Sequence, residues 1–269
     1  MFIYIRKKHI IITVVTLTVL MAVSLVAFAL QPKVQAVQSY SWGLHFEKKN
    51  EIPIPNLSDE VLTPYNAYFH GDTSKKTIYI TFDAGYENGY TAPILDALKK
   101  HNAPAAFFLV GPYIENNPEL VKRMVAEGHI VGNHSYNHPD MTQKNYDDFK
   151  NQLDKTASAF KDVTGQEMPK FYRPPEGKFT EENLKWAQQQ GYTTVLWSSA
   201  YVDWNNDDQP SHSYAFEKIA DRTFDGAIFL LHSTSKTNRE ILDRQLTIWE
   251  KAGYSFGKIS DIAPKKDRQ

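Results

Sequence analysis

With 269 residues, 42% of them hydrophobic and 23% charged, the chain has an ordinary globular composition, which argues against a disordered chain and against several membrane spans. Its 30 basic and 31 acidic residues give a net charge of -1. Residues 1–36 contain four of the basic residues and no acidic one, so the remainder has a net charge of -5. Such an acidic body is a poor candidate for binding nucleic acid. The absence of cysteine excludes disulfide bonds, a cysteine nucleophile and a cysteine-ligated metal.

Residues 1–36 have the pattern of a targeting segment. Three basic residues at positions 6–8 precede an uncharged apolar run at 10–30. Its length is close to the roughly 20 residues that span a bilayer, whereas a secretory signal has an apolar core of about 7–15 residues. Small residues at 27–29 and 34–36 would suit a signal peptidase, so a cleaved signal and an uncleaved membrane anchor both stay open. Either one predicts an exported protein that acts outside the cytoplasm.

Residues 37–75 contain proline and asparagine without steady periodicity, and we expect an ordered leader there rather than a separate domain. One catalytic domain is expected over 76–264, followed by a polar tail at 265–269. Within that domain, strand patterns alternate with helix patterns. Thr91, Asn117 and Thr180 are expected to cap three of the helices, and Gly128, Gly165 and Gly191 are expected to stop three. The expected strands are 77–82, 105–110, 129–133, 171–174, 193–197 and 227–231, and the expected helices are 91–102, 118–127, 146–163, 181–190, 214–222 and 239–253.

This alternation predicts a mostly parallel α/β sheet with helices outside it. The first strand is not followed by a glycine-rich phosphate-binding fingerprint, which disfavours a dinucleotide-binding fold and favours a barrel. In such barrels the chemistry gathers at the carboxyl ends of the strands. Polar or aromatic residues stand at five of these ends: Asp83, His134 with His138, Arg173, Asp203 with Trp204, and His232.

His134 and His138 are spaced i and i+4. On one helical turn both imidazoles would project to the same side and share a cation such as Zn²⁺. The pair alone is weak evidence, because two exposed histidines on a helix have the same spacing. A catalytic metal commonly has three protein ligands and one open position, so a third ligand is expected nearby.

Five segments in order, "TFDAG", "HSYNH", "RPPEG", "VDW" and "LLH", resemble the motifs of the polysaccharide deacetylase (NodB-homology) family. The resemblance runs from about residue 77 to the C-terminal region. The longer "TFDAGYENGY", "AYVDW" and the Trp42-Gly43 pair are similar to the branch that forms muramic δ-lactam in spore cortex peptidoglycan. The resemblance implies a distorted (β/α) barrel and a hydrolase of linear amide C–N bonds.

The resemblance also implies roles for the residues at the strand ends. Asp83 matches the catalytic base, and His134 and His138 match the metal ligands. His232 matches the general acid that protonates the leaving amine, and these roles agree with the chemistry of amide hydrolysis. Arg173 matches the arginine that orients the base, and Asp203 is expected to be its tuning partner.

Three more residues are expected to contact the substrate. Trp204 is interpreted as a wall of the pocket, although a packing role is equally open, and Pro174 and Glu176 belong to the "RPPEG" motif. The family more often has an aromatic residue at the position of Glu176, and the cortex branch has a basic one. An acid there would repel the lactyl or peptide carboxylate of a muramic substrate.

Ala84 is the main departure from the family pattern. The usual second aspartate supplies a metal ligand, and alanine has no donor atom. We therefore expect a divalent Zn, Mn or Co ion to be held weakly, by His134, His138, water and Asp83. Glu87 or Asn88 would be replacement ligands in one interpretation and turn residues in the other.

The leading hypothesis is metal-dependent de-N-acetylation of N-acetylmuramic acid in peptidoglycan, by a monomer that acts on glycan strands. One alternative is de-N-acetylation of N-acetylglucosamine in peptidoglycan or chitin-like oligomers. The other is a glycan-binding pseudoenzyme that lost its metal with the change to Ala84. The retained base, acid and arginine favour an enzyme, because a binding protein does not need them.

Overall fold

The computed structural model describes residues 9, 12–13, 15–21 and 38–262. Residues 38–262 belong to one compact unit, and the described residues before position 22 belong to a separate part of the chain. No helix among the described residues is long and apolar enough to cross a membrane. Most of the expected signal or anchor at 1–36, and all of the tail at 265–269, lie outside the described residues.

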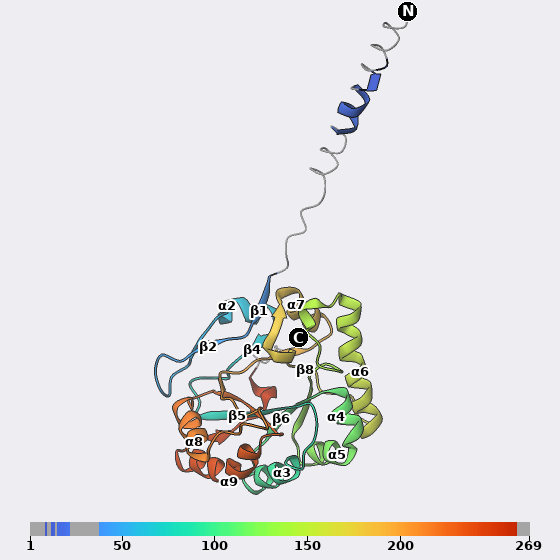
Figure 1. Ribbon diagram of the computed structural model, residues 1–269. Helices are drawn as coiled ribbons and strands as arrows, with labels where there is room; N and C mark the ends of the chain where they lie inside the picture. Colours follow the sequence, from blue (N-terminus) through green and yellow to red (C-terminus); the bar gives the residue numbers. More distant parts are fainter. Residues whose placement is uncertain (1–8, 10–11, 14, 22–37, 263–269) are drawn as a thin grey trace, which may run out of the picture. The chain divides into compact units, whose positions relative to one another are not determined.

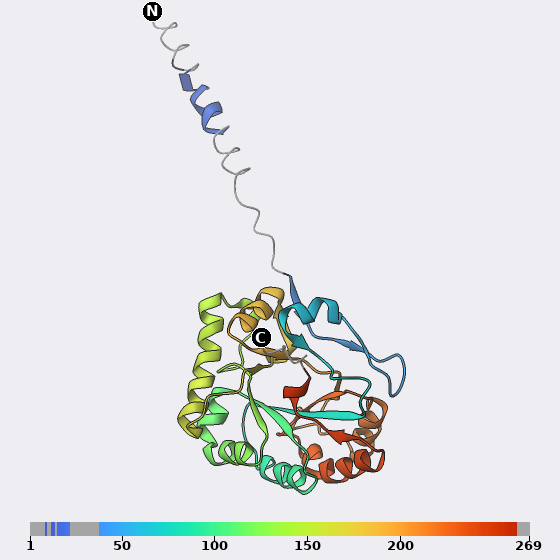
Figure 2. The same cartoon turned by 180° about the vertical axis from the view of Figure 1, so that it is seen from behind.

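The compact unit is built on one curled sheet of parallel strands, with helices around its outer side (Figures 1 and 2). The sheet starts at β11 and ends at β4, which makes an incomplete barrel and confirms the expected fold. Each neighbouring pair is parallel. In spatial order the strands are β11 (Ser199–Ala200), β12 (Ile228–His232), β5 (Thr77–Ala84), β6 (Ala105–Leu109), β7 (Ile130–Asn133), β8 (Phe171–Tyr172), β10 (Thr193–Val195) and β4 (Ala67–Tyr68).

The helices bury one apolar face each against this sheet. In α3 the buried residues Ile94, Leu95 and Leu98 follow the i, i+1, i+4 spacing of a helix face. On the sheet, the rings of Phe82 and Phe107 stack with centroids 5.1 Å apart. The helices are α2 (Asp59–Leu62), α3 (Thr91–Lys100), α4 (Gly111–Asn116), α5 (Pro118–Ala126), α6 (Tyr146–Thr164), α7 (Glu181–Gln189), α8 (His212–Asp221) and α9 (Lys236–Lys251).

The expected helices are present, with small shifts at their ends. Thr180 caps α7 in a reciprocal capping box with Asn183, and α6 ends at Gly165, whose φ of 71° suits glycine. The expectation that Thr91 caps α3 is wrong by one residue, because the helix begins at Thr91 and Tyr90 is the cap. Helix α4 was not expected, because its six residues are too few to show a periodic pattern.

The leader is ordered and belongs to the same unit as the sheet. β1 (Ser39–Ser41) pairs antiparallel with β9 (Lys178–Thr180), and β4 pairs with β10 at the edge of the sheet. β2 (Leu44–His45) and β3 (Ile54–Pro55) form a short antiparallel hairpin. Near the other end of the chain, β13 (Ser255–Phe256) pairs with the start of β5.

Gly132 of β7 leaves room for an aromatic ring that packs against Arg173. The ring of Phe108 on β6 packs against this position, and the guanidinium of Arg173 lies 4.2 Å from the centre of that ring. A Cβ at position 132 would lie 2.7 Å from the Phe108 ring and 3.2 Å from the carbonyl oxygen of Phe171. The glycine therefore supports the ring on which Arg173 rests.

We expect Gly132→Ala to lower the free energy of unfolding by about 1–3 kcal/mol, because the added methyl group overpacks a buried ring. Urea unfolding followed by circular dichroism measures this change. Gly85→Ala is the matched control, since a Cβ there meets nothing within 4 Å. Equal stability of the two variants would contradict the proposed packing constraint.

Candidate active site

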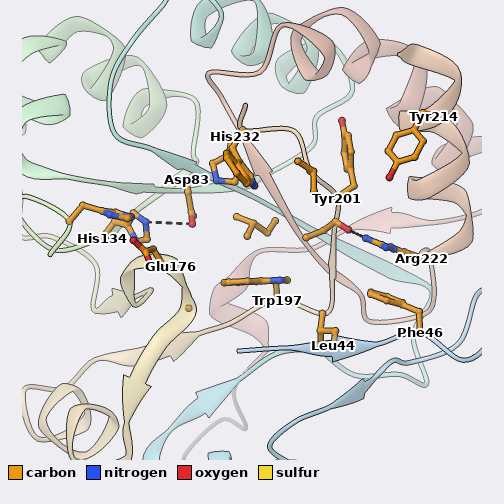
Figure 3. Close-up of a pocket in the computed structure, with 16 residues that line it drawn as sticks. Leu44, Phe46, Asp83, His134, Glu176, Trp197, Tyr201, Tyr214, Arg222 and His232 are labelled. Atoms are coloured by element: carbon orange, nitrogen blue, oxygen red, sulfur yellow. Dashed lines mark hydrogen bonds and ion pairs between the residues drawn. The ribbon is translucent and has the colours of Figure 1, made fainter. Parts of the chain in front are cut away.

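The carboxyl ends of the strands open into a cleft of about 850 Å³. Asp83, His134, His138 and His232 line it together with aromatic residues (Figure 3). Asp83 and His232 are register partners on the adjacent strands β5 and β12. The strand-end positions that the sequence pattern singled out are thus brought together.

Asp83 is a buried carboxylate with two different neighbours. Arg173 Nη1 donates to its Oδ1 at 2.7 Å, and His134 Nε2 lies 3.6 Å from its Oδ2. Burial alone would raise the pKa of Asp83, but the charges of Arg173, His134 and His232 outweigh burial and the pKa is lowered. The carboxylate is therefore ionised at neutral pH and can accept a proton.

Arg173 is completely buried and held at every side. Besides its bond to Asp83, its Nε donates to the carbonyl oxygen of Val195 at 3.0 Å and its Nη2 to that of Leu196 at 3.4 Å. Its guanidinium plane rests on Phe108. A guanidinium group held in this way keeps the carboxylate of Asp83 in one orientation.

The two histidines come together without a helix, so the expectation of a helical turn is wrong. Their ring centroids are 4.8 Å apart, in a loop after β7 where Ser135 and His138 have φ angles of 63° and 55°. Asn133 Oδ1 accepts from the Ser135 amide at 3.0 Å, and Ser135 Oγ accepts from the His138 amide at 3.1 Å. These side-chain bonds to the backbone replace the helical pattern.

His134 is oriented as a metal ligand would be. Its Nδ1 donates to the carbonyl oxygen of Arg173 at 2.9 Å, which leaves the lone pair on Nε2. Burial lowers the pKa of His134 to about 4, so the ring is neutral at neutral pH. The Nε2 lone pair and the Asp83 carboxylate oxygen, both acceptors, face each other, and a cation or a water hydrogen between them would relieve their repulsion.

The remaining metal donors are few. Ala84 is buried and has no donor atom, and among the residues that the structure describes no group of three or more His, Asp or Glu is arranged to hold a metal. Glu87 accepts from the amides of Gly89 and Thr91 at 2.6 and 3.3 Å, and Asn88 donates to the carbonyl oxygen of Thr234 at 2.7 Å. The turn interpretation therefore describes Glu87, and Asn88 bonds to another loop. His134 and His138 are therefore the residues that would hold an ion. Ala84, at the position where a third ligand was expected, has no donor atom.

Asp203 pairs with His232 and not with Arg173, which corrects the expected partner. His232 Nδ1 donates to Asp203 Oδ1 at 2.7 Å, and Asp203 Oδ2 accepts from the His232 amide at 2.8 Å and from Asn238. Burial opposes the charged form of His232, but Asp203 outweighs burial and raises the pKa of the ring. His232 therefore keeps its proton to a higher pH than an ordinary imidazole and can act as an acid.

The expected substrate contacts divide into two groups. Trp204 lines the cleft with 59% of its surface exposed, and Glu176 lines it beside Gly177. Glu176 Oε2 lies 2.5 Å from Lys178 Nζ, so part of its negative charge is compensated. Pro174 is buried and is not among the residues that line this cleft.

Several residues of the cleft were not predicted from the sequence. Trp197 is the last residue of an expected strand, and this position could have marked it as a cleft residue. Phe46 lies in the leader, and Tyr214 and Arg222 belong to helix α8 and its C-cap, where no motif marks them.

The chain is similar to known proteins over most of its length. Residues 70–195 match the family model described as polysaccharide deacetylase. The peptidoglycan-N-acetylmuramic acid deacetylase PdaA of Bacillus subtilis is 40% identical over 247 residues, which are 91% of this chain and 94% of that protein. The solved structure of that family 4 carbohydrate esterase superposes with a TM-score of 0.80 over 84% of this chain and 97% of the other.

Two further relatives differ in what their names state. A peptidoglycan-N-acetylglucosamine deacetylase of Bacillus cereus is 40% identical over 170 residues, 63% of this chain and 60% of that protein. A family 4 carbohydrate esterase pseudoenzyme from Bacillus anthracis is 31% identical, with a TM-score of 0.68 over 73% of this chain and 68% of the other. The chain belongs to the polysaccharide deacetylase family, whose deacetylases are in general metal-dependent hydrolases of amide bonds.

Replacing Asp203 by asparagine should shift the pH dependence of activity in one direction. Asp203 raises the pKa of His232, so its loss lowers that pKa, and the proton is lost at lower pH. We expect the alkaline limb of kcat/KM to move to lower pH by about one unit or more, while the acid limb stays in place. Asp207→Asn, an exposed change in the same loop, is the control. An alkaline limb that does not move would contradict the role of the Asp203–His232 pair.

Proposed function

We propose that the protein removes the acetyl group from N-acetylmuramic acid in peptidoglycan, outside the cytoplasm, as a step toward muramic δ-lactam in spore cortex. The observation that carries this proposal is the pair of opposed proton carriers in one cleft. Arg173 favours the ionised form of Asp83 by lowering its pKa, and Asp203 favours the protonated form of His232 by raising its pKa. Hydrolysis of an amide needs a base for the attacking water and an acid for the leaving amine.

The proton transfers follow from these two positions. Asp83 accepts a proton from the water as its oxygen bonds to the acetyl carbon. His232 donates its proton to the amide nitrogen as the C–N bond breaks, which yields acetate and a free amine on the sugar. Arg173 keeps Asp83 in place, and Asp203 keeps the Nδ1 side of His232 occupied, so that Nε2 carries the proton that is donated. A divalent ion on His134 and His138, when bound, supplies Lewis-acid polarisation of the acetyl carbonyl.

The choice of muramic acid is supported by the B. subtilis relative, which matches over nearly the full length of both chains. The N-acetylglucosamine deacetylase of B. cereus matches a smaller part of each chain, and it makes glucosamine the alternative substrate. Ala84 and the absence of a third donor among the described residues make a glycan-binding pseudoenzyme the second alternative, and the B. anthracis relative is itself described as a pseudoenzyme.

Acetyl release from defined glycans separates these functions. The purified protein is incubated with peptide-free peptidoglycan fragments, with and without Zn²⁺, Mn²⁺ or Co²⁺, and mass spectrometry identifies the sugar that loses acetyl. We expect loss on muramic acid, reduced about 100-fold or more in Asp83→Asn. Loss on glucosamine alone would establish the first alternative. No loss with any metal, alongside intact glycan binding, would establish the pseudoenzyme.

Metal affinity is the second prediction of this proposal. With two imidazoles and no donor at Ala84, we expect a dissociation constant for Zn²⁺, Mn²⁺ or Co²⁺ weaker than about micromolar in calorimetric titration. Ala84→Asp adds the missing carboxylate and should tighten binding about tenfold or more, whereas Ala84→Asn, of similar size but uncharged, should tighten it less. A micromolar or tighter site in the unmodified protein would contradict weak binding.

A further inference from the structure

We propose that Arg222 binds a carboxylate of the glycan and thereby sets where the muramic residues lie along the cleft. This inference rests on the proposed function, because it takes peptidoglycan as the ligand. Arg222 lines the same cleft as Asp83 and His232. Figure 3 shows it with Phe46 and Tyr214 at the end of the cleft opposite His134 and Glu176.

The guanidinium of Arg222 is fixed in place but not neutralised. Its Nη1 donates to the carbonyl oxygen of Ala200, and its plane lies 4.2 Å from the centre of the Phe46 ring. Among the described residues, no carboxylate lies within ion-pair distance of it. The adjacent Asp221 pairs instead with Lys49 at 2.9 Å. Arg222 is also the only lysine or arginine among the described residues that line the cleft.

Attachment of the loop after β2 to the end of α8 does not explain the presence of this arginine. The loop after β2 is already held to the end of α8 by Asn50, whose amide donates to the Asp221 carbonyl oxygen at 2.8 Å. The Asn50 side chain donates to the carbonyl oxygens of Ala220 and Thr223 at 2.7 and 3.0 Å. The hydrogen bonds of Asn50 therefore attach the loop to α8 without a contribution from Arg222.

A half-buried cation without a partner is costly, and an anion from the ligand would offset that cost. Guanidinium groups bind carboxylates through two parallel hydrogen bonds, and a guanidinium that is already fixed by Phe46 and Ala200 loses little freedom on binding. On a peptide-free strand each muramic residue carries a lactyl carboxylate. At the opposite end the acid Glu176 disfavours a carboxylate, even with its charge partly compensated by Lys178. The cleft therefore has a positively charged end at Arg222 and a negatively charged end at Glu176.

Binding measured without turnover tests this inference. In an Asp83→Asn background, quenching of Trp197 and Trp204 fluorescence reports glycan binding, because both rings line the cleft. The ligands are a peptide-free muramic fragment, the same fragment with its lactyl carboxylates converted to amides, and an N-acetylglucosamine oligomer of equal length. We expect Arg222→Gln to weaken binding of the carboxylate fragment about tenfold and to leave the other two unchanged. Arg222→Lys should lose less, and Lys48→Gln, in the nearby loop, should have no effect.

The two fragments also test the inference without any substitution at Arg222. If the parent protein binds the carboxylate and amide fragments equally, the proposal is overturned. Equal weakening of all three ligands by Arg222→Gln would overturn it too, because it would show a general change in the cleft. A peptidoglycan fragment that keeps its stem peptides is a further ligand. If Arg222→Gln weakens the binding of that fragment alone, the contact belongs to a carboxylate of the stem peptide.

Failure of the proposed function gives a different result. In that case the native protein releases no acetyl from muramic acid, whereas carboxylate-dependent binding at Arg222 persists. Acetyl release from muramic acid with equal KM for the carboxylate and amide fragments would leave the function in place and remove the role of Arg222.

Discussion

The buried ion pair between Arg173 and Asp83 is the contact on which the site depends. One guanidinium joins the end of β5 to the end of β10, through the carbonyl oxygens of Val195 and of Leu196, the residue that follows. The carbonyl oxygen of the same arginine accepts from His134, so the arginine also sets which nitrogen of that ring is free. A buried carboxylate without this partner would lose its charge, because the cost of burial would raise its pKa.

Two aspartates in this site have different tasks because their partners differ. Asp83 meets a permanent cation and faces the cleft, so it is a free acceptor. Asp203 is fully buried, and its two oxygens are occupied by His232 and Asn238, so its charge acts only through the imidazole. Since β5 and β12 are adjacent and in register, Asp83 and His232 lie side by side at the carboxyl ends of their strands, where one bound group can reach both.

The sequence was sufficient for six strands of the main sheet, for the helices between them and for the residues at the strand ends, because these depend on local periodicity and chain order. The two-residue strands β4 and β11 at the edges of the sheet were not expected, because they are too short to show a period. It was not sufficient for choices that depend on tertiary packing. The partner of Asp203, the loop that joins His134 to His138, and the place of Phe46 and Arg222 in the cleft are set by segments far apart in sequence. The short helix α4 lacked enough residues to show a period.

The change to Ala84 acts on only one part of this machinery. Asp83 is held by Arg173 and His232 by Asp203, and neither pair includes a contact with residue 84. The orientation of His134 depends on the Arg173 carbonyl oxygen and is equally independent of that position. Under the proposed function we therefore expect Ala84 to weaken the hold on the ion and to leave Asp83 and His232 in place. Asp83 and His232 both face the cleft with their partners in place although residue 84 has no donor atom, and this arrangement favours an enzyme with a loosely held metal over a chain that only binds glycan.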